Sequence, residues 1–557
     1  MEPEKTHLDT VENASQQSSD LAGRHGAAEH NKPNLPYEAG ENDIVTMKTW
    51  IVVTVLSLSY GLSFWSVPAI GAIGTQIATE LGNPSDAAWW TTTYTMTTAI
   101  SFMLFGGNSD LFGRRWFIIA GNVLVFIGLI LIGSAKNTQS ITAGNASIGV
   151  GADASTWIAV LFGPITARYA IIHEGRWRWL FYSPAIITGI SFVLLVILYH
   201  PPKHPRGIPW GQALKQLDYL GMLLFTVGAT LVFTGVIYTT ILPSSNTKVV
   251  ATLSAGFGTI VLFALWETFG KVKQPLTPPW VFAQDKGREF FFPFIAGTIV
   301  NMFFYSVNIA YPTAINVLWT DPTTPLSYSI ELTLPQNLGL IFGSMMLMIF
   351  GIKIGHWKWQ FVGSFAVMTI FGALLALATP NNRAMIMVFV FICEGAYGWA
   401  QTLSIAWIQF GVPQTELGIS GALAGVARWT GGAIASSMYL TILANTQGKK
   451  AAQLVPAAAM KAGASSSTAQ ALLKALPLGA TAIAKVANTT PAMVQAAGAA
   501  FVQSYVVGLR TICLVSIAFG VIGTICCALS NDIGPKMNRK IEVFLENDVQ
   551  AEKNKFH

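Results

Sequence analysis

Charged side chains are scarce in this sequence. They make up 11% of its 557 residues, whereas soluble domains usually contain about a quarter. Hydrophobic residues reach 52% and occur in long runs. This composition argues against a soluble domain and indicates a protein that crosses a membrane many times.

Cysteine is also rare, and basic residues do not cluster. The four cysteines, Cys393, Cys513, Cys526 and Cys527, lie within or at the ends of apolar runs, which argues against a disulfide framework. The net charge of +6 is small, and lysines and arginines fall in short segments beside apolar runs. We therefore expect a lipid bilayer, and not nucleic acid, as the partner of this chain.

Signatures of enzymes are missing as well. A membrane oxidase or desaturase, the main alternative class, would use a cluster of histidines. His200 and His204 are four residues apart, but Pro201 and Pro202 prevent their presentation on one helix face. No nucleophile elbow, phosphate loop or dinucleotide fingerprint is positioned on a strand and helix. We expect no enzymatic activity, no metal and no cofactor.

Long apolar runs define about twelve spans of the length that a membrane helix needs. They cover residues 50–70, 89–105, 116–134, 179–198, 221–237, 250–266, 291–310, 337–352, 361–377, 384–407, 423–443 and 506–529. The predicted fold class is an all-α polytopic membrane protein. Residues 1–47 are polar and lack the apolar core of a cleaved signal, so we expect a disordered cytoplasmic tail.

Basic residues set the expected orientation of these spans. Connecting segments that contain lysine and arginine alternate with charge-poor segments, which assigns the basic ones to the cytoplasm. They contain Lys203, Arg206 and Lys215; Lys271, Lys273, Lys286 and Arg288; Lys353 and Lys358; and Lys536, Arg539 and Lys540. Both termini, including a tail at 531–557, are then cytoplasmic. The expected location is the plasma membrane, with the vacuolar membrane as the alternative.

The segment 141–172 does not fit a single crossing. The chain is outside after the third span and inside at Lys203, so this segment crosses an even number of times. Two spans need roughly 40 residues, more than the segment contains, and Asp153 and Ser155 interrupt it. Either two short helices form a hairpin, or the segment is a re-entrant loop buried by protein.

The turn between the second and third spans carries the most specific motif. Gly106, Asp110, Gly113, Arg114 and Arg115 form the pattern G-x-x-x-D-x-x-G-R-R. Glycine allows helix ends to approach closely, aspartate can cap a helix start, and paired arginines mark a cytoplasmic face. The pattern resembles the signature loop of the major facilitator superfamily.

Further motifs narrow the resemblance to one family. They are Gly144-Asn145-x-x-Ile148-Gly149-x-Gly151-Ala152, Phe162-Gly163-Pro164, Trp177-Arg178-Trp179, Tyr199-His200-Pro201-Pro202, Leu217-Asp218-Tyr219-x-Gly221 and Arg428-x-x-Gly431-Gly432. Over about residues 48–540, their order and spacing resemble the fungal trichothecene efflux pump family. That family is related to fourteen-helix drug:proton antiporters and to siderophore transporters.

The resemblance implies about 12–14 membrane helices in two bundles, at residues 48–200 and 289–530. A cytoplasmic loop at 201–220 and two extra helices at 221–266 would connect them. The segment 141–172 would be a shortened fourth and fifth helix, through a natural deletion or an error in the gene model. Gly163 and Pro164 are a remnant of the antiporter motif of the fifth helix, but Ala167 and Arg168 replace the paired glycines expected after them.

The family mechanism is alternating access, in which the bundles rock around a substrate near the midplane. The signature loop would latch neighbouring helix ends in the outward-facing state. Its echo, Gly351-x-Lys353-x-Gly355-His356-Trp357-Lys358, lies at the corresponding turn of the second half and lacks the aspartate.

Two ionisable residues, Glu394 and Arg428, lie inside apolar runs. A charge at the centre of a membrane costs about 2.5–3.5 kcal/mol on insertion scales, so such residues tend to be paired or functional. Glu394 could carry the coupling proton while Arg428 stabilises its charged form. Alternatively, the two side chains pair with each other or with backbone carbonyls and only hold helices together.

Other residues near these positions predict a cavity. Trp65, Tyr94, Tyr397, Trp399 and Gln401 could enclose an apolar or amphipathic compound. Aromatic side chains in membrane helices also pack or anchor at the interface, which is the alternative reading.

The alanine-rich segment 445–503 is expected to be an external loop. Pro456, Pro477 and Pro491 predict that it is broken into short helical pieces. Leu472, Leu473 and Leu476 could place it on the outer membrane face, but an alanine-rich linker is the simpler description. Asn488-Thr489-Thr490 matches an N-glycosylation sequon on that side.

These features together predict a monomeric secondary transporter. It would export a hydrophobic or amphipathic small molecule, such as a toxin or drug, in exchange for protons. Two alternatives remain. One is a siderophore-iron transporter of the same fold, and the other is a transport-deficient relative or sensor with shortened fourth and fifth helices.

Overall fold

The computed structural model describes residues 47–82, 86–151, 157–170, 175–200, 209–243, 245–321, 323–413, 416–478 and 480–537. Several sequence predictions lie outside these residues. They concern the tail before Met47, Asp153 and Ser155, the basic residues Lys203 and Arg206, and the chain after Met537.

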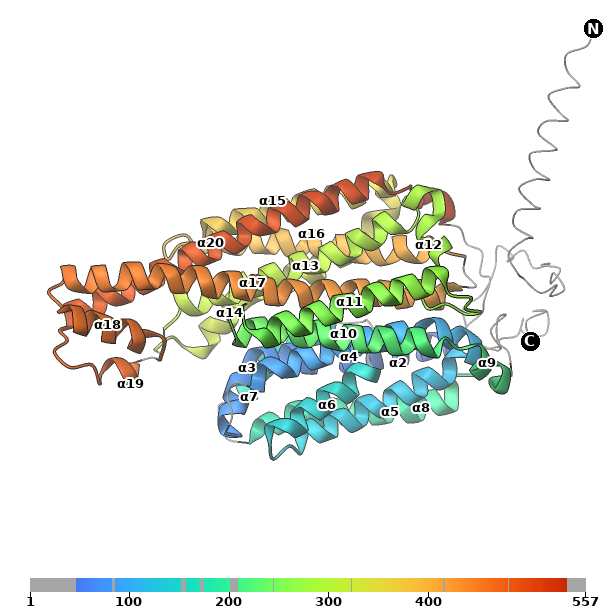
Figure 1. Ribbon diagram of the computed structural model, residues 1–557, viewed down its shortest axis with the longest axis horizontal. Helices are drawn as coiled ribbons and strands as arrows, with labels where there is room; N and C mark the ends of the chain where they lie inside the picture. Colours follow the sequence, from blue (N-terminus) through green and yellow to red (C-terminus); the bar gives the residue numbers. More distant parts are fainter. Residues whose placement is uncertain are drawn as a thin grey trace, which may run out of the picture. The chain divides into compact units, whose positions relative to one another are not determined.

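The first half of the described chain consists of helices joined by short connections (Figure 1). They are α2 (Met47–Ser63), α3 (Ser66–Glu80), α4 (Ala87–Phe112), α5 (Arg114–Gly133), α6 (Thr138–Gly151), α7 (Trp157–Ala170), η2 (Arg176–Arg178) and α8 (Trp179–Leu198), followed by α9 (Trp210–Gln216), α10 (Tyr219–Ile241), α11 (Thr247–Phe269), α12 (Pro279–Ala283) and η3 (Gln284–Gly287).

The second half is also helical. It contains α13 (Phe291–Ala314), η4 (Ile315–Trp319), α14 (Leu326–Ile354), α15 (Trp357–Leu374), η5 (Leu375–Leu377), α16 (Arg383–Phe410), α17 (Leu417–Lys461), α18 (Ser466–Ala475), η7 (Leu476–Leu478), α19 (Ala480–Ile483), α20 (Pro491–Leu529) and η8 (Gly534–Lys536). Within the described ranges, extended pairing is limited to an isolated bridge between Leu217 and Gln274.

The predicted fold class, an all-α polytopic membrane protein, is confirmed. Ten helical segments of the described chain are long and apolar enough to cross a membrane. The expected spans at 89–105 and 423–443 correspond to α4 and α17, which are not among those ten. Threonine in α4, and glycine and alanine in α17, lower the hydropathy of these helices. Both lie inside the bundle, where packing against other helices replaces contact with lipid.

Two hydrophobic cores underlie the bundle. One joins α3, α4, α5 and α8 and includes Trp90, Trp177 and Phe181. The other joins α13, α15, α16 and α20 and includes Phe303, Phe365 and Trp407. Contacts of α4 with α17 connect the two halves, and α10 packs on α11. The midline of the bundle is therefore formed by α4 and α17.

Within the segment 141–172, the described residues form two short helices. The helices α6 and α7 contain 14 residues each, which is about 21 Å of helix against a hydrocarbon thickness of about 30 Å. They pack on different partners, α6 on α4 and α5 and α7 on α3. Neither is long enough to cross the membrane alone.

Glycines hold α6 against α5. A Cβ atom built on Gly128 would lie 2.5 Å from the carbonyl oxygen of Gly144 and 2.6 Å from the side chain of Ile148. The reverse contact is equally close, since a Cβ on Gly144 would meet the carbonyl oxygen of Gly128 at 2.7 Å. Only glycine allows the two backbones to approach this far.

The alanine-rich segment 445–503 is a packed helical subdomain and not a linker. α17 continues unbroken for 45 residues, with Pro456 inside it, so the prediction that Pro456 breaks the helix is wrong. α17 and α20 extend past the bundle and meet α18 and α19 there (Figure 1). Val455, Ala459, Ala469 and Leu472 form a small core that supports the helix on both sides of the proline.

The close packing of α5 on α6 predicts a site where added volume is not tolerated. Gly128→Leu should destabilise the protein by about 1–3 kcal/mol, because the new side chain overlaps Gly144 and Ile148. The melting temperature of the purified chain in detergent measures this loss. Gly258→Leu in α11 is the matched control, since a Cβ there meets nothing within 4 Å. Equal melting temperatures for both variants would contradict the packing of α6.

Candidate functional site

The signature loop is a one-residue turn between α4 and α5. Gly113 has a φ of 91° and a ψ of 130°, a conformation that is accessible almost only to glycine. At the corresponding turn of the second half, Gly355 and His356 join α14 to α15 with φ values of 60° and 47°. The predicted echo therefore folds as a tight turn at the equivalent place.

Asp110 links α4, α5 and α17. Its carboxylate is fully buried. One oxygen accepts hydrogen bonds from Nε and Nη2 of Arg114, at 3.0 and 2.8 Å, and the other accepts from the backbone N–H of Gly418 at 2.9 Å. Gly418 lies in the first turn of α17, where backbone N–H groups have no partner within the helix. A carboxylate there also interacts favourably with the helix dipole.

Gly106 lets α4 approach α17 at the same point. A Cβ on Gly106 would lie 2.8 Å from the carbonyl oxygen of Gly418 and would also overlap Ala422. Arg115 faces the other way, donating to the carbonyl of Val196 at 3.0 Å and lying 2.9 Å from Nε2 of His200. The five motif residues thus tie α4 to α17 and α5 to the end of α8.

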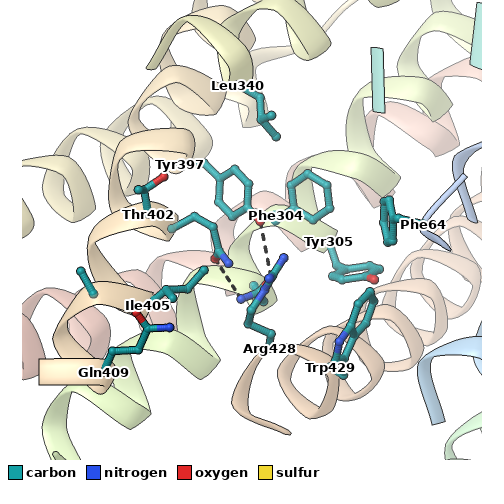
Figure 2. Close-up of a pocket in the computed structure, with 13 residues that line it drawn as sticks. Phe64, Phe304, Tyr305, Leu340, Tyr397, Thr402, Ile405, Gln409, Arg428 and Trp429 are labelled. Carbon is teal, nitrogen blue, oxygen red and sulfur yellow. Dashed lines mark hydrogen bonds between the residues drawn. The ribbon is translucent and has the colours of Figure 1, made fainter. Parts of the chain in front are cut away.

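A cavity of about 360 Å³ lies within the second half of the bundle and meets the first half at Phe64 (Figure 2). The side chains around it come from α13, α14, α16 and α17 and from the break between α2 and α3. They are Phe64, Asn301, Phe304, Tyr305, Leu340, Tyr397, Gln401, Thr402, Ile405, Ala406, Gln409, Arg428 and Trp429.

Phe64 reaches this cavity because the first span is not one helix. α2 ends at Ser63 and α3 begins at Ser66. Pro68 has no N–H to donate to the carbonyl of Phe64 four residues earlier, which favours a break at this point. The ring of Phe64 lies 5.8 Å from that of Trp429, so the break brings the first span against α17.

Polar groups on one wall of the cavity bind each other. Nδ2 of Asn301 donates to Oε1 of Gln401 at 3.0 Å, and the Tyr397 hydroxyl donates to Oδ1 of Asn301 at 3.4 Å. Tyr397 also stacks on Phe304, with ring centroids 4.6 Å apart. This wall offers a flat aromatic surface beside a row of amide groups.

Of the five predicted cavity residues, Tyr397 and Gln401 line the cavity. Tyr94 lies behind the wall and packs edge-on against Trp429 at 5.5 Å. Trp65 packs against the first core and Trp399 against the second, and neither lines the cavity. Whether a predicted residue lines the cavity depends on the face of its helix on which the side chain lies.

Glu394 and Arg428 do not pair. Glu394 is 1% exposed, and neither of its carboxyl oxygens has a hydrogen-bond partner. The side chain of Gln336 lies close to it without meeting hydrogen-bond geometry. Glu394 lies one helical turn from Tyr397 and does not line the cavity, whereas Arg428 does. The pairing of the two residues considered from the sequence is therefore not formed in this structure.

A second cavity, of about 570 Å³, borders the first and shares Ile405, Gln409 and Arg428 with it. It extends to Gly106 and Arg114 at the signature loop and to the end of α6. The residues that complete its lining are Leu56, Ser57, Ser63, Ser101, Phe102, Phe105, Ser109, Phe117, Ile118, Gly121, Asn122, Val125, Val150, Gly151, Leu417, Gly418, Gly421, Ala422, Ala424 and Gly425.

The other predicted sites lie elsewhere. In α7, a Cβ on Gly163 would meet Pro68 of α3 at 3.0 Å, so the antiporter-motif remnant contacts the first span. The side chain of Pro164 is outside the described residues. Asn488 is exposed beside α20, with a φ of 58°. The four cysteines are buried and unpaired, and no described group of three or more His, Cys, Asp or Glu side chains could hold a metal.

Most residues of the cavity wall were not predicted from the sequence. Asn301 was detectable, because it is a polar residue inside the apolar run 291–310. Phe304, Tyr305 and Phe64 had no comparable signal, since aromatic residues are frequent throughout the spans. Arg428 was singled out for its charge, and its place in the lining came only with the structure.

The contacts of Asp110 predict a specific loss of stability. Asp110→Asn removes the charge that binds Arg114 and the Gly418 N–H, and should cost about 1.5–3 kcal/mol. Thermal unfolding of the purified chain measures this. Asp321→Asn is the matched control, because Asp321 is exposed and its partners, Thr323 and Thr324, belong to its own loop. A similar loss of stability in both variants would show that the contacts of Asp110 with Arg114 and Gly418 do not stabilise the fold.

Comparison with known proteins agrees with this architecture. The profile of the family described as "Fungal trichothecene efflux pump (TRI12)" matches residues 47–168 and 157–556. The "MFS-type transporter prx5" of Penicillium rubens is 40% identical over 534 residues, covering 91% of this chain and 95% of the relative.

A trichothecene efflux pump of Fusarium sporotrichioides is 24% identical, covering 86% of this chain and 85% of the pump. The crystal structure of the POT family transporter PepTSo aligns with a TM-score of 0.46 and 11% identity, over 85% of this chain and 98% of PepTSo. The family profile, the relatives and the all-α membrane bundle agree, and the chain belongs to the fungal trichothecene efflux pump family of the major facilitator superfamily.

Proposed function

We propose that this chain exports an amphipathic small molecule by alternating access, driven by protons. The observation that carries the proposal is the cavity that the second half of the bundle lines together with Phe64 of the first half. It combines aromatic rings with a few polar groups, and its volume of about 360 Å³, beside a second cavity of about 570 Å³, suits a drug-sized ligand. The efflux pumps among the relatives support the outward direction.

The latch supports the rocking of two bundles. Asp110 and Gly106 hold α4 of one half against α17 of the other. Opening the bundle at this end requires these contacts to break, and closing it restores them. The basic residues around the turn assign this end to the cytoplasm by the positive-inside rule.

Glu394 is the proposed proton carrier. An unpaired carboxylate is costly to bury, so a protonated side chain suits its place without hydrogen-bond partners. Its position one turn from Tyr397 couples it to the cavity wall. Movement that hydrates Glu394 would release the proton, and binding of the proton would favour return to the buried state.

A transport-deficient relative or sensor is the second candidate function. It is favoured by the lengths of α6 and α7, because two 14-residue helices replace the spans that complete the first bundle in the family. Such a protein would bind ligand without exporting it. The two functions therefore differ in export and not in binding.

Several attributes complete the proposal. The protein is a monomer of the plasma membrane with both termini in the cytoplasm. The subdomain built on α18 is then external, and Asn488, which is exposed there, is the proposed glycosylation site.

The test is export from yeast cells that lack their own drug exporters. The probes are 11-(dansylamino)undecanoic acid and its methyl ester, which are fluorescent amphipathic molecules. Cells that express the chain should retain less of at least one probe than cells with an empty vector, and a protonophore should abolish the difference. Equal retention of both probes in both cell types, with the chain present in the membrane, would refute export of such molecules.

Substitution of Glu394 tests proton coupling. Glu394→Gln keeps the shape of the side chain but cannot exchange a proton, so protonophore-sensitive export should fall at least tenfold while probe binding stays within about twofold. Glu331→Gln, at an exposed position of α14, is the control and should export normally. Unchanged export by Glu394→Gln would remove Glu394 from the coupling mechanism.

A further inference from the structure

Among the described residues that line the 360 Å³ cavity, Arg428 is the one with a charged side chain. It also lines the 570 Å³ cavity, and neither lining includes an aspartate or glutamate from the described part of the chain. Its Nε is buried without a hydrogen-bond partner, and it forms no ion pair with a described carboxylate. A guanidinium has five N–H donors. At the point where the two cavities meet, Arg428 therefore has N–H groups that can donate hydrogen bonds to a ligand.

Arg114 provides a contrast within the same lining. It also faces the larger cavity, but Asp110 occupies its Nε and Nη2 groups at 3.0 and 2.8 Å. Its charge is neutralised by the latch. Arg428 has no such partner, and Glu394, the acidic residue of the facing helix α16, lies outside the lining and unpaired.

The surroundings of Arg428 are apolar and aromatic. The guanidinium lies 5.9 Å from the ring centre of Trp429, and Phe64 packs against the same ring. Tyr305 lines the same cavity as Arg428. In Figure 2, Arg428 points into the space bounded by Phe304, Tyr305 and Trp429. Cation–π contact with the rings lowers the free-energy cost of burying the guanidinium. The rings do not neutralise its charge.

We propose that the cargo is an amphipathic acid, whose carboxylate binds the guanidinium of Arg428 and whose apolar body lies along the aromatic walls of the two cavities. A carboxylate matches the planar fork of arginine with two parallel hydrogen bonds. A cationic cargo would meet an uncompensated positive charge in a site of low dielectric, so this arrangement selects against it. The inference rests on the proposed function, since it takes the cavities as the cargo site.

Binding of matched probes tests this preference. The full-length chain in detergent is titrated with 11-(dansylamino)undecanoic acid and with its methyl ester, which differ only in the charge of the head group. Binding is followed as energy transfer from tryptophan to dansyl, corrected by displacement with excess unlabelled ligand. The wild type should bind the acid at least about tenfold more tightly than the ester, as expected for one charge-assisted pair.

Three variants assign the preference to Arg428. Arg428→Gln should weaken binding of the acid about tenfold and leave binding of the ester within twofold, which also shows that the variant is folded. Arg428→Lys should keep part of the preference, because the charge remains and the fork is lost. Lys450→Gln, at an exposed position of α17 outside both cavities, should bind like the wild type.

The outcomes separate this inference from the proposed function. Equal binding of acid and ester by the wild type, or an acid preference that survives in Arg428→Gln, overturns the acid-cargo inference and leaves a neutral amphipathic cargo. Failure of both probes to bind the wild type overturns the inference together with the assignment of the cavities as a cargo site.

Discussion

The contact between α4 and α17 is the interaction on which the rest of the bundle depends. Gly106 removes the side chain that would separate the two backbones, and the buried carboxylate of Asp110 satisfies the Gly418 N–H at the start of α17. The N–H groups in the first turn of a helix have no partner within that helix, so a side-chain acceptor at this point satisfies one of them. The same carboxylate binds Arg114, so helix start, tight turn and junction of the two halves are stabilised by one buried group.

The turn and the spans were predictable because their signals are local. Glycine allows helix ends to approach closely, an aspartate can cap a helix start, and apolar runs of sufficient length form helices. The cavity wall was not predictable to the same degree. Trp399 and Gln401 are two residues apart on α16, yet only Gln401 lines the cavity. Which side chains of a helix line the cavity depends on how the helix is rotated against its neighbours. That rotation depends on contacts between residues distant in the sequence.

Dependence on distant contacts also limits what the sequence predicts at Pro456 and in the shortened helices of segment 141–172. Pro456 was expected to end a helix, but the small core around Val455 and Ala459 holds α17 together through it. Residues 141–172 were too short for two spans, and the structure accommodates them as two partial helices on different partners. The family profile matches the chain in two pieces that overlap within α7, at residues 157–168. The even number of crossings required between the third span and Lys203 indicates this irregularity, and contacts with neighbouring helices determine its form.

The unbroken length of α17 has a mechanical consequence. Its 45 residues extend over about 68 Å at 1.5 Å per residue. The helix begins beside the Asp110 contact and ends in the core of the 445–503 subdomain. A helix of that length that tilts as one body acts as a lever. A tilt of about 10° around the end held by Asp110 would displace the other end by about 12 Å. Small rearrangements beside the Arg114 turn would therefore be magnified at the other end of the helix, where α18 packs on α17.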